Sequence, residues 1–531
     1  MSMNSDLDHM MFSVEDTLLY TFGYLSTDDL LKAAVVDKTF YSGARNDVLW
    51  RLHCSLEFGT AALEDLPPGP CGSPDEPPLS FFQLFLTWSE SFHGYRRADV
   101  KAMHSWWTQL EDWFRLYAPP MLETLNPPAS ENDIAESCRL YGSKPLPYML
   151  RLMYRFHDGQ KALYDHTSSA DSPTLNQRLL GLFGGTSFYD SEITMRLLPI
   201  IEVQTLTGLI TGQRLMGKSH SHPHSSTYHA DSLEVTASDH TITSMESCVV
   251  FSRSVVDLRK IYCLGPDASD SSGGSIVGSG SVFVSNAQLG LTPCHPSSSS
   301  PSTPYFQTWL FEYLRRLQDG IYTFQPVDLA DEQATGLSLD MAAARMISLF
   351  PMKPFTEPLS SRPEQNLGAS RCVTRNIEVV AAPAYIPEKS YPPHRSFFWS
   401  YSIRLRMLPP GHPEHNPNIT PQNCQLTTRH WRIYEPKGEH PDHQQGHTQN
   451  VDGEGVIGMF PILKPSISSG DGSGMEDTWP FAYQSCSTAN SFPGNFKGHM
   501  KFVPGSKHSP SGSAFEVDLA EFPLAVPEFI Y

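Results

Sequence analysis

Apolar residues recur with helical spacing close to the start of the chain. Phe22 lies four residues after Leu18 and three after Leu19, and Leu25 follows three residues later. This spacing places the four side chains on one face of an amphipathic helix within Ser13–Leu25. We therefore expect the segment to pack this face against other elements or against a partner.

Two capping boxes predict where helices begin in this region. Ser13 precedes Asp16 by three residues, and Ser26 precedes Asp29 by three. In this pattern the serine and the carboxylate each accept a backbone hydrogen bond at the helix start. The apolar face continues at Leu30, Leu31, Ala34 and Val35, and Trp50 lies in the run that closes the segment. We predict a three-helix module over residues 12–56, too small to bury a self-sufficient core.

The next part of the chain reads as a linker followed by more helix. Residues 57–99 combine a Pro-rich run with a helical connector that resumes at Phe81. One helical face then carries Trp106, Trp107, Leu110, Trp113, Phe114 and Tyr117. Such an aromatic stripe is more often core than a ligand site. Ser130 and Asp133 form another capping box, and Tyr305–Gly320 again has helical periodicity.

Two inserts in this region have the composition of disordered segments. Residues 217–247 are rich in Ser and His, and residues 265–304 are dominated by Ser, Gly and Pro. Neither insert carries enough apolar residues to offset the entropy lost on ordering. Four histidines cluster in the first insert, His220, His222, His224 and His229. A flexible loop sets no ligand geometry, so we favour a loop over a metal site.

The pattern changes to strands in the last third of the chain. Ile377–Tyr385, Phe397–Met407 and Cys424–Tyr434 are rich in β-branched and aromatic residues, with Gly, Pro and Asn turns between them. Regular strands without intervening helices are typical of a sandwich or barrel. We predict a linker over 326–370 and an all-β domain over 371–531.

Composition excludes several classes of protein. The chain has 38 Lys and Arg against 57 Asp and Glu, a net charge of −19, which disfavours nucleic acid or an anionic membrane as the main partner. We see neither a signal peptide at the start nor a run of about 20 apolar residues that could span a bilayer. We expect a soluble intracellular protein, cytoplasmic or nuclear.

The cysteine spacing and the absence of common catalytic motifs leave no basis for a catalytic mechanism. The nine cysteines are scattered without a C-x-x-C pair, so they fit neither a zinc ribbon nor a RING finger. The common hydrolase, zinc-protease and Walker motifs are absent. We expect no cofactor, no metal and no catalytic residue.

The N-terminal pattern resembles the F-box, the adaptor-binding motif of substrate receptors in Skp-cullin-F-box ubiquitin ligases. The family's apolar contacts correspond to Leu18, Leu19, Phe22, Leu25, Leu30, Leu31, Val35 and Trp50. The family usually opens with Leu-Pro, where this chain has Ser13-Val14. The resemblance implies docking on the Skp adaptor, and through it on cullin and RING subunits. The alternative is an amphipathic cap on the next domain.

Two further resemblances cover the rest of the chain. The helices around Leu146-Pro147-Tyr148 and the Asp158-Gly159 turn resemble the SMI1/KNR4-type (SUKH) domain, which implies an α+β domain over 100–325. Residues from Arg429 to Pro523 resemble the ApaG domain, a fibronectin-like sandwich. Together the resemblances imply a multi-domain α+β substrate receptor for an unknown protein. A ubiquitin-independent scaffold is the first alternative.

A glycine-rich turn leaves a second alternative. Gly453, Gly455 and Gly458 spell G-x-G-x-x-G, the dinucleotide fingerprint, which binds pyrophosphate only where it opens a helix. Phe460-Pro461 and the surrounding strand pattern favour a tight turn instead. Backbone amides of such a turn could bind an anion, so a phosphate- or nucleotide-binding protein is the less favoured alternative.

Overall fold

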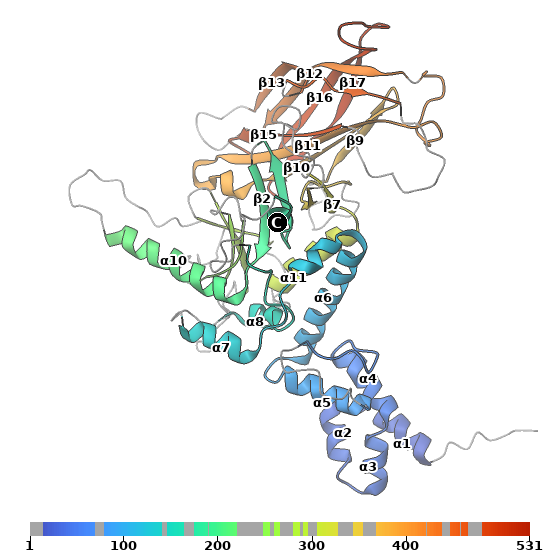
Figure 1. The fold of residues 1–531 in the computed structure, drawn as a ribbon, viewed down its shortest axis with the longest axis vertical. Coiled ribbons are helices and arrows are strands. Elements are labelled where there is room, and N and C mark those ends of the chain that lie inside the picture. The colour runs from blue at the N-terminus through green and yellow to red at the C-terminus, as the bar shows by residue number, and fades with distance from the viewer. Residues whose placement is uncertain are drawn as a thin grey trace, which may run out of the picture. The chain divides into compact units, whose positions relative to one another are not determined.

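The computed structural model divides into two compact units. Its helices and strands are drawn in Figure 1. It describes residues 14–68, 79–140, 146–163, 175–189, 191–219, 248–254, 260–265, 280–286, 290–295, 305–327, 344–353, 368–420, 422–437, 446–456, 458–465 and 481–531. The first unit comprises Met1–Leu110, Pro127–Glu136 and Met149–Asp158. The second comprises Glu111–Asn126, Ser137–Tyr148 and Gly159–Tyr531.

Helices form the first part of the described chain. They are α1 Val14–Phe22, α2 Thr27–Ala33, α3 Lys38–Ala44, α4 Asp47–Glu57, α5 Phe81–Ser91 and α6 Arg97–Tyr117. Four helices therefore occupy residues 14–57, and the prediction of three is wrong. Two unrecognised N-caps explain the difference. Asp37 accepts a hydrogen bond from the Phe40 amide at 2.8 Å, and Asn46 accepts one from the Val48 amide at 3.0 Å.

An aromatic cluster forms the core of these helices. The ring of Trp50 lies 4.8 Å from Phe82 and 4.8 Å from Phe85 between centroids. Its indole N–H donates to the carbonyl oxygen of Ala44 at 2.7 Å. Only 1 % of Trp50 is exposed. The predicted connector over 57–99 thus supplies α5, which completes the core that α1–α4 cannot build alone.

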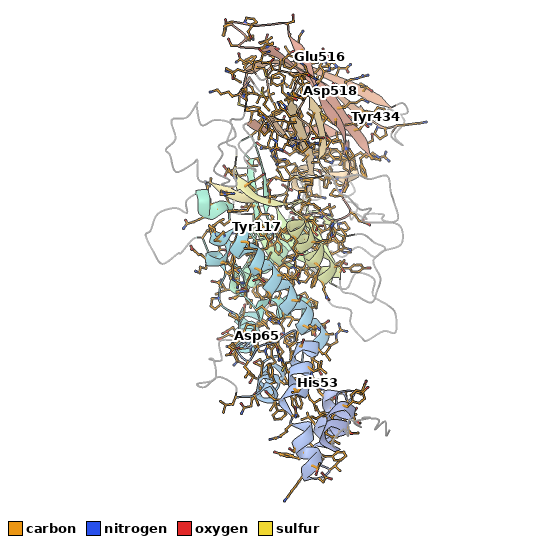
Figure 2. The ribbon with its side chains drawn as sticks, turned by 90° about the vertical axis from the view of Figure 1, so that its right-hand side faces the viewer. His53, Asp65, Tyr117, Tyr434, Glu516 and Asp518 are labelled. Carbon is orange, nitrogen blue, oxygen red and sulfur yellow. The ribbon has the colours of Figure 1, made fainter. Side chains whose placement is uncertain are left out.

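Two predictions for residues 97–140 are confirmed. The aromatic stripe of α6 is buried except at Tyr117, which is 59 % exposed and is labelled in Figure 2. A reciprocal capping box begins α7 Glu131–Leu140. The Ser130 amide donates to Asp133 Oδ2 at 2.8 Å, and the Asp133 amide donates to Ser130 Oγ at 3.0 Å. The η1 turn Pro119–Thr124 and α8 Tyr148–Tyr154 flank this helix.

The second unit contains a mixed eight-stranded sheet. Its order is β6-β5-β4-β3-β2-β1-β8-β7. The strands are β1 Gly185–Phe188, β2 Ser191–Leu197, β3 Val249–Ser254, β4 Ile261–Leu264, β5 Val282–Ser285, β6 Leu291–Pro293, β7 Thr323–Pro326 and β8 Arg345–Ser348. The helices are α9 Leu175–Leu179, α10 Ile200–Ser219 and α11 Tyr305–Gln318, and α11 confirms the predicted helix. β1 and β8 are parallel, and the other neighbouring strands are antiparallel.

Two segments predicted to lack regular structure contribute strands to this sheet. β5 and β6 lie within 265–304, which we expected to be disordered, and β8 lies within 326–370, which we expected to be a linker. Both expectations are wrong at these strands. Val282 and Val284 are fully buried, and Ile347 is 1 % exposed. A strand of four residues barely changes the composition of a segment of about forty residues, so composition does not reveal it. In the folded protein, neighbouring strands pair with the backbone groups of these short strands and cover their side chains.

A sandwich of two antiparallel sheets follows (Figure 1). One sheet is β15-β11-β10-β9 and the other is β13-β12-β16-β17, with β14 paired to β12. The strands are β9 Ser370–Thr374, β10 Ile377–Tyr385, β11 Phe397–Met407, β12 Cys424–Glu435, β13 His447–Glu454, β14 Ile462–Leu463, β15 Phe481–Ala489, β16 Gly494–Pro504 and β17 Phe515–Leu524. The three strands predicted from the sequence are confirmed. Tyr401 and Phe496 pack across the two sheets, 4.9 Å apart.

Residues that follow β17 return to the central sheet and its helix α11. The ring of Tyr531 lies 5.0 Å from Trp309 and 5.2 Å from Tyr313, and its hydroxyl donates to the Trp309 carbonyl oxygen at 2.9 Å. In return the Trp309 indole N–H donates to the Ile530 carbonyl oxygen at 3.0 Å. Figure 1 marks this end of the chain beside α11. These contacts join the sandwich to the central sheet.

A buried ion pair provides a second link between the central sheet and the sandwich. Lys260, beside β4, lies 3.5 Å from Glu388 in the η5 turn Pro387–Lys389, and the two side chains are 1 % and 0 % exposed. Removing one partner of such a pair leaves an uncompensated charge inside the protein. The pair therefore opposes separation of these two parts of the second unit.

We expect Tyr531→Ala to destabilise the second unit. The change removes a buried aromatic ring and leaves a cavity, a loss of about 3–5 kcal/mol in the free energy of unfolding. Tyr531→Phe keeps the ring and loses one hydrogen bond, about 1 kcal/mol. Urea unfolding followed by tryptophan fluorescence measures both. Equal, small losses for the two variants would contradict the packing described for this residue.

Candidate functional site

Large apolar side chains are exposed along the N-terminal helices. Nine of them between residues 20 and 56 are at least 40 % exposed. These are Tyr20, Tyr24, Leu31, Val35, Val36, Tyr41, Val48, Leu52 and Leu56, which we call the exposed apolar set. Single exposed apolar residues are ordinary, whereas a concentration of them marks an interaction surface. The exposed apolar set is therefore the candidate functional site.

The residues predicted to bind a partner are divided between the core and the surface. Phe22, Leu30 and Trp50 are 3 % exposed or less, so they support the helices from inside. Leu18, Leu19 and Leu25 are half-buried. Leu31 and Val35 are 40 % and 84 % exposed and belong to the exposed apolar set. The structure thus brings only part of the predicted set to the surface.

Sequence reasoning missed exposed residues on the other side of the first helix. Tyr20 and Tyr24 lie four residues apart, with ring centroids at 5.3 Å and hydroxyl oxygens at 2.8 Å. They are 71 % and 75 % exposed. The i, i+4 spacing could have identified this pair as a second apolar stripe. The sequence alone does not show which of the two stripes is buried.

Local contacts fix the helices that carry the exposed apolar set. Ser26 caps α2: the Asp29 amide donates to Ser26 Oγ at 3.2 Å, and Ser26 Oγ donates to Asp29 Oδ2 at 2.8 Å. This confirms Ser26 as the predicted start of a helix, although Asp29 accepts from the Ser26 hydroxyl and not from its backbone amide. Ser13 lies outside the described residues. Gly43 of α3 lets α1 approach closely, because a Cβ there would lie 2.8 Å from Leu18 and 3.2 Å from Phe22.

A polar network joins α2, α4 and α6. Arg97 donates to Glu57 Oε2 and to Thr27 Oγ1, both at 2.6 Å. His53, labelled on α4 in Figure 2, places Nδ1 3.5 Å from Glu57 Oε1. Burial disfavours the Glu57 carboxylate, but the hydrogen bonds from His53 and Arg97 outweigh it and lower the pKa of Glu57. Glu57 is therefore ionised in the folded protein at neutral pH.

The glycine-rich turn forms between strands and does not open a helix. β13 ends at Glu454, and Val456 pairs with Met459. Gly455 has φ +55°, and a Cβ there would lie 2.1 Å from the Met459 carbonyl oxygen. Three backbone amides in this segment, those of Gly455, Val456 and Met459, already donate to carbonyl oxygens. These amides are not available to bind an anion.

Among the described residues, no group of three His, Cys, Asp or Glu side chains could hold a metal ion. The four clustered histidines of the first insert lie outside that part of the chain. Within the described helices, none is both long and apolar enough to cross a membrane. Burial raises the pKa of the Cys54 and Cys424 thiols to about 12, so both stay protonated at neutral pH.

The whole chain is similar to known F-box proteins. The chain is 29 % identical to F-box protein SKIP16 of Arabidopsis thaliana over 521 residues, which cover 96 % of each chain. It is 23 % identical to F-box only protein 3 of Homo sapiens, covering 97 % of this chain and 82 % of that protein.

The sandwich has relatives of its own. The family model of the ApaG domain matches residues 387–504. Protein ApaG of Rhodopseudomonas palustris is 31 % identical over 158 residues, which cover 30 % of this chain and 94 % of that protein. These matches confirm the predicted ApaG resemblance. The order of the motifs in the sequence had predicted this resemblance.

We expect Glu57→Gln to lower the free energy of unfolding of the helices in the first unit. The substitution should also reduce the dependence of that free energy on pH. The carboxylate contributes this stability fully above its unfolded pKa, and the contribution is lost as pH falls through the lowered pKa of the folded protein. At neutral pH the loss is about 1 kcal/mol, because Arg97 is partly exposed. Urea unfolding at pH 7 and at acid pH measures it. An unchanged pH dependence in the variant would refute the role assigned to Glu57.

Proposed function

Because this chain is an F-box protein with a C-terminal ApaG domain, we propose that it is the substrate-recognition subunit of a Skp-cullin-F-box ubiquitin ligase. In this role the N-terminal helices bind the Skp adaptor, which connects the chain to cullin and RING subunits. The observation that carries the proposal is the exposed apolar set, found on the helices where an F-box protein needs a docking surface.

The adaptor contacts that we propose differ from the full predicted set. Leu31 and Val35 are accessible and are proposed to bind the adaptor directly. Leu18, Leu19 and Leu25 contribute their exposed edges. Phe22, Leu30 and Trp50 act by holding the helices in place. Desolvated apolar anchors near the centre of an interface supply most of its binding energy.

The chain needs no chemistry of its own for this function. A receptor raises the effective concentration of a target lysine near the thioester carried by the conjugating enzyme. We propose that the central sheet with its helices is a SUKH-like domain, and that it and the ApaG sandwich present the substrate. The contacts of Tyr531 and the Lys260–Glu388 ion pair join the central sheet to the sandwich. These contacts support the proposal that the two domains present a substrate together. This role places the protein in the cytoplasm or nucleus.

A ubiquitin-independent scaffold is the rival proposal. Deleting residues 1–60 does not separate the two, because the deletion removes Trp50 from its contacts with Phe82 and Phe85. Both proposals then predict a damaged helical unit. Substitutions of exposed residues leave this core intact and are the better test.

We expect Leu31→Asp and Val35→Asp to weaken adaptor binding by at least about tenfold each, since each places a charge in an apolar interface. Pull-down and calorimetry with the purified Skp adaptor measure the loss. Leu116→Asp is the matched control, because Leu116 is 74 % exposed and belongs to the second unit. Circular dichroism verifies that all three variants fold.

The receptor proposal fails if the wild-type chain does not bind the adaptor. If Leu31→Asp and Val35→Asp bind the adaptor as tightly as the wild type, the assignment of the adaptor contact to Leu31 and Val35 is wrong, because the adaptor would then bind elsewhere. Retained binding to other proteins together with no adaptor binding would favour the scaffold.

A further inference from the structure

A cavity of about 500 Å³ opens in the second unit where β2 ends and α10 begins. Its size lies within the range of about 300–1,000 Å³ typical of ligand sites. The chain segments around it are Gln160–Leu163, the end of β2, the first three turns of α10, and Arg253 of β3. We call this cavity the α10 groove.

One wall of the α10 groove is apolar. Ile201, Thr205 and Leu209 follow one another at intervals of four residues, so they form one stripe of α10 along the opening. Ile201 is 57 % and Leu209 is 56 % exposed. Leu197 and Leu198 close the floor and are buried. The wall offers contact to a large apolar side chain.

Another part of the lining of the α10 groove carries cations. Arg196 and Arg253 are direct partners across β2 and β3, so they share one face of the sheet. Arg196 is anchored: its guanidinium donates to the backbone oxygens of Gln177, Leu180 and Lys161 at 2.9–3.2 Å. The structure thus holds two positive charges side by side.

The charge of the α10 groove is not balanced from within. In the part of the chain that the structure describes, no ion pair or hydrogen bond engages the side chains of Arg253 or Lys161. Glu202 is the one carboxylate among the lining residues, against Lys161, Arg196 and Arg253. This local excess of cations stands out in a chain of net charge −19. A carboxylate on a partner would complement it.

We infer that the α10 groove binds a short peptide segment of a partner protein, in which a large apolar residue is followed closely by Asp or Glu. The apolar side chain packs on Ile201 and Leu209, and the carboxylate accepts hydrogen bonds from Arg253 and Lys161. The inference rests on the proposed receptor function, because it names the class of segment that a substrate would present.

The test begins with an unbiased peptide selection. A phage-displayed random peptide library is selected on the immobilised full-length chain, and the binding of a synthetic selected peptide is measured by fluorescence anisotropy. Selected peptides should pair a large apolar residue with an acidic residue a few positions later. Affinity should fall as NaCl concentration rises, because exposed charge pairs are screened.

Groove variants then locate the binding site. Arg253→Glu and Ile201→Asp should each weaken binding of the selected peptide by at least about tenfold, and Arg253→Gln should weaken it less than Arg253→Glu. Two matched controls lie elsewhere in the second unit: Arg432→Glu for the charge reversal and Leu116→Asp for the apolar position, both at exposed residues. The controls should bind like the wild type.

Three results would overturn the inference. They are selected peptides without acidic residues, equal losses in the groove variants and the controls, and a wild-type dimer, seen by light scattering, that Arg253→Glu dissociates. In the last case a second copy of the chain occupies the groove. Adaptor binding, measured on the same variants, should be unchanged. If the wild type selects the expected peptides but does not bind the adaptor, the receptor function fails and the groove assignment stands.

Discussion

The N-terminal helices carry more large apolar side chains than their own core can bury. Four short helices leave little interior, and Trp50, Phe22 and Leu30 fill it together with rings supplied by α5. The exposed apolar set is what remains outside. Surplus apolar surface of this kind is costly in water and stabilises the protein only when a partner covers it. This constraint connects the fold of the first unit to its proposed adaptor-binding function.

In the second unit, long-range contacts hold the central sheet and the sandwich together. Tyr531 is inserted among Trp309, Tyr313 and their neighbours, and the Lys260–Glu388 pair is buried nearby in the same unit. Both contacts join residues far apart in the sequence. A substrate platform benefits from such rigidity, since a segment bound at one place is presented in a fixed geometry.

Local pattern predicted the sandwich well. The strands at Ile377–Tyr385 and Phe397–Met407 carry enough β-branched and aromatic residues to identify themselves. β5 and β8 were missed because four residues give too weak a local signal, and only long-range pairing makes them strands. Trp50 was assigned to the docking face for a related reason. Its spacing shows that it is apolar and helical, whereas its burial depends on Phe82 and Phe85 more than thirty residues away.

Hydrogen–deuterium exchange of the full-length chain, with and without the purified Skp adaptor, tests the central claim most directly. Amides over residues 14–57, which include Leu31 of α2 and Val35 of the turn that follows it, should exchange more slowly in the complex, while those of the central sheet and the sandwich should be unchanged. If the adaptor protects the second unit and leaves α1–α4 unaffected, or protects nothing, the exposed apolar set is not the adaptor-binding surface.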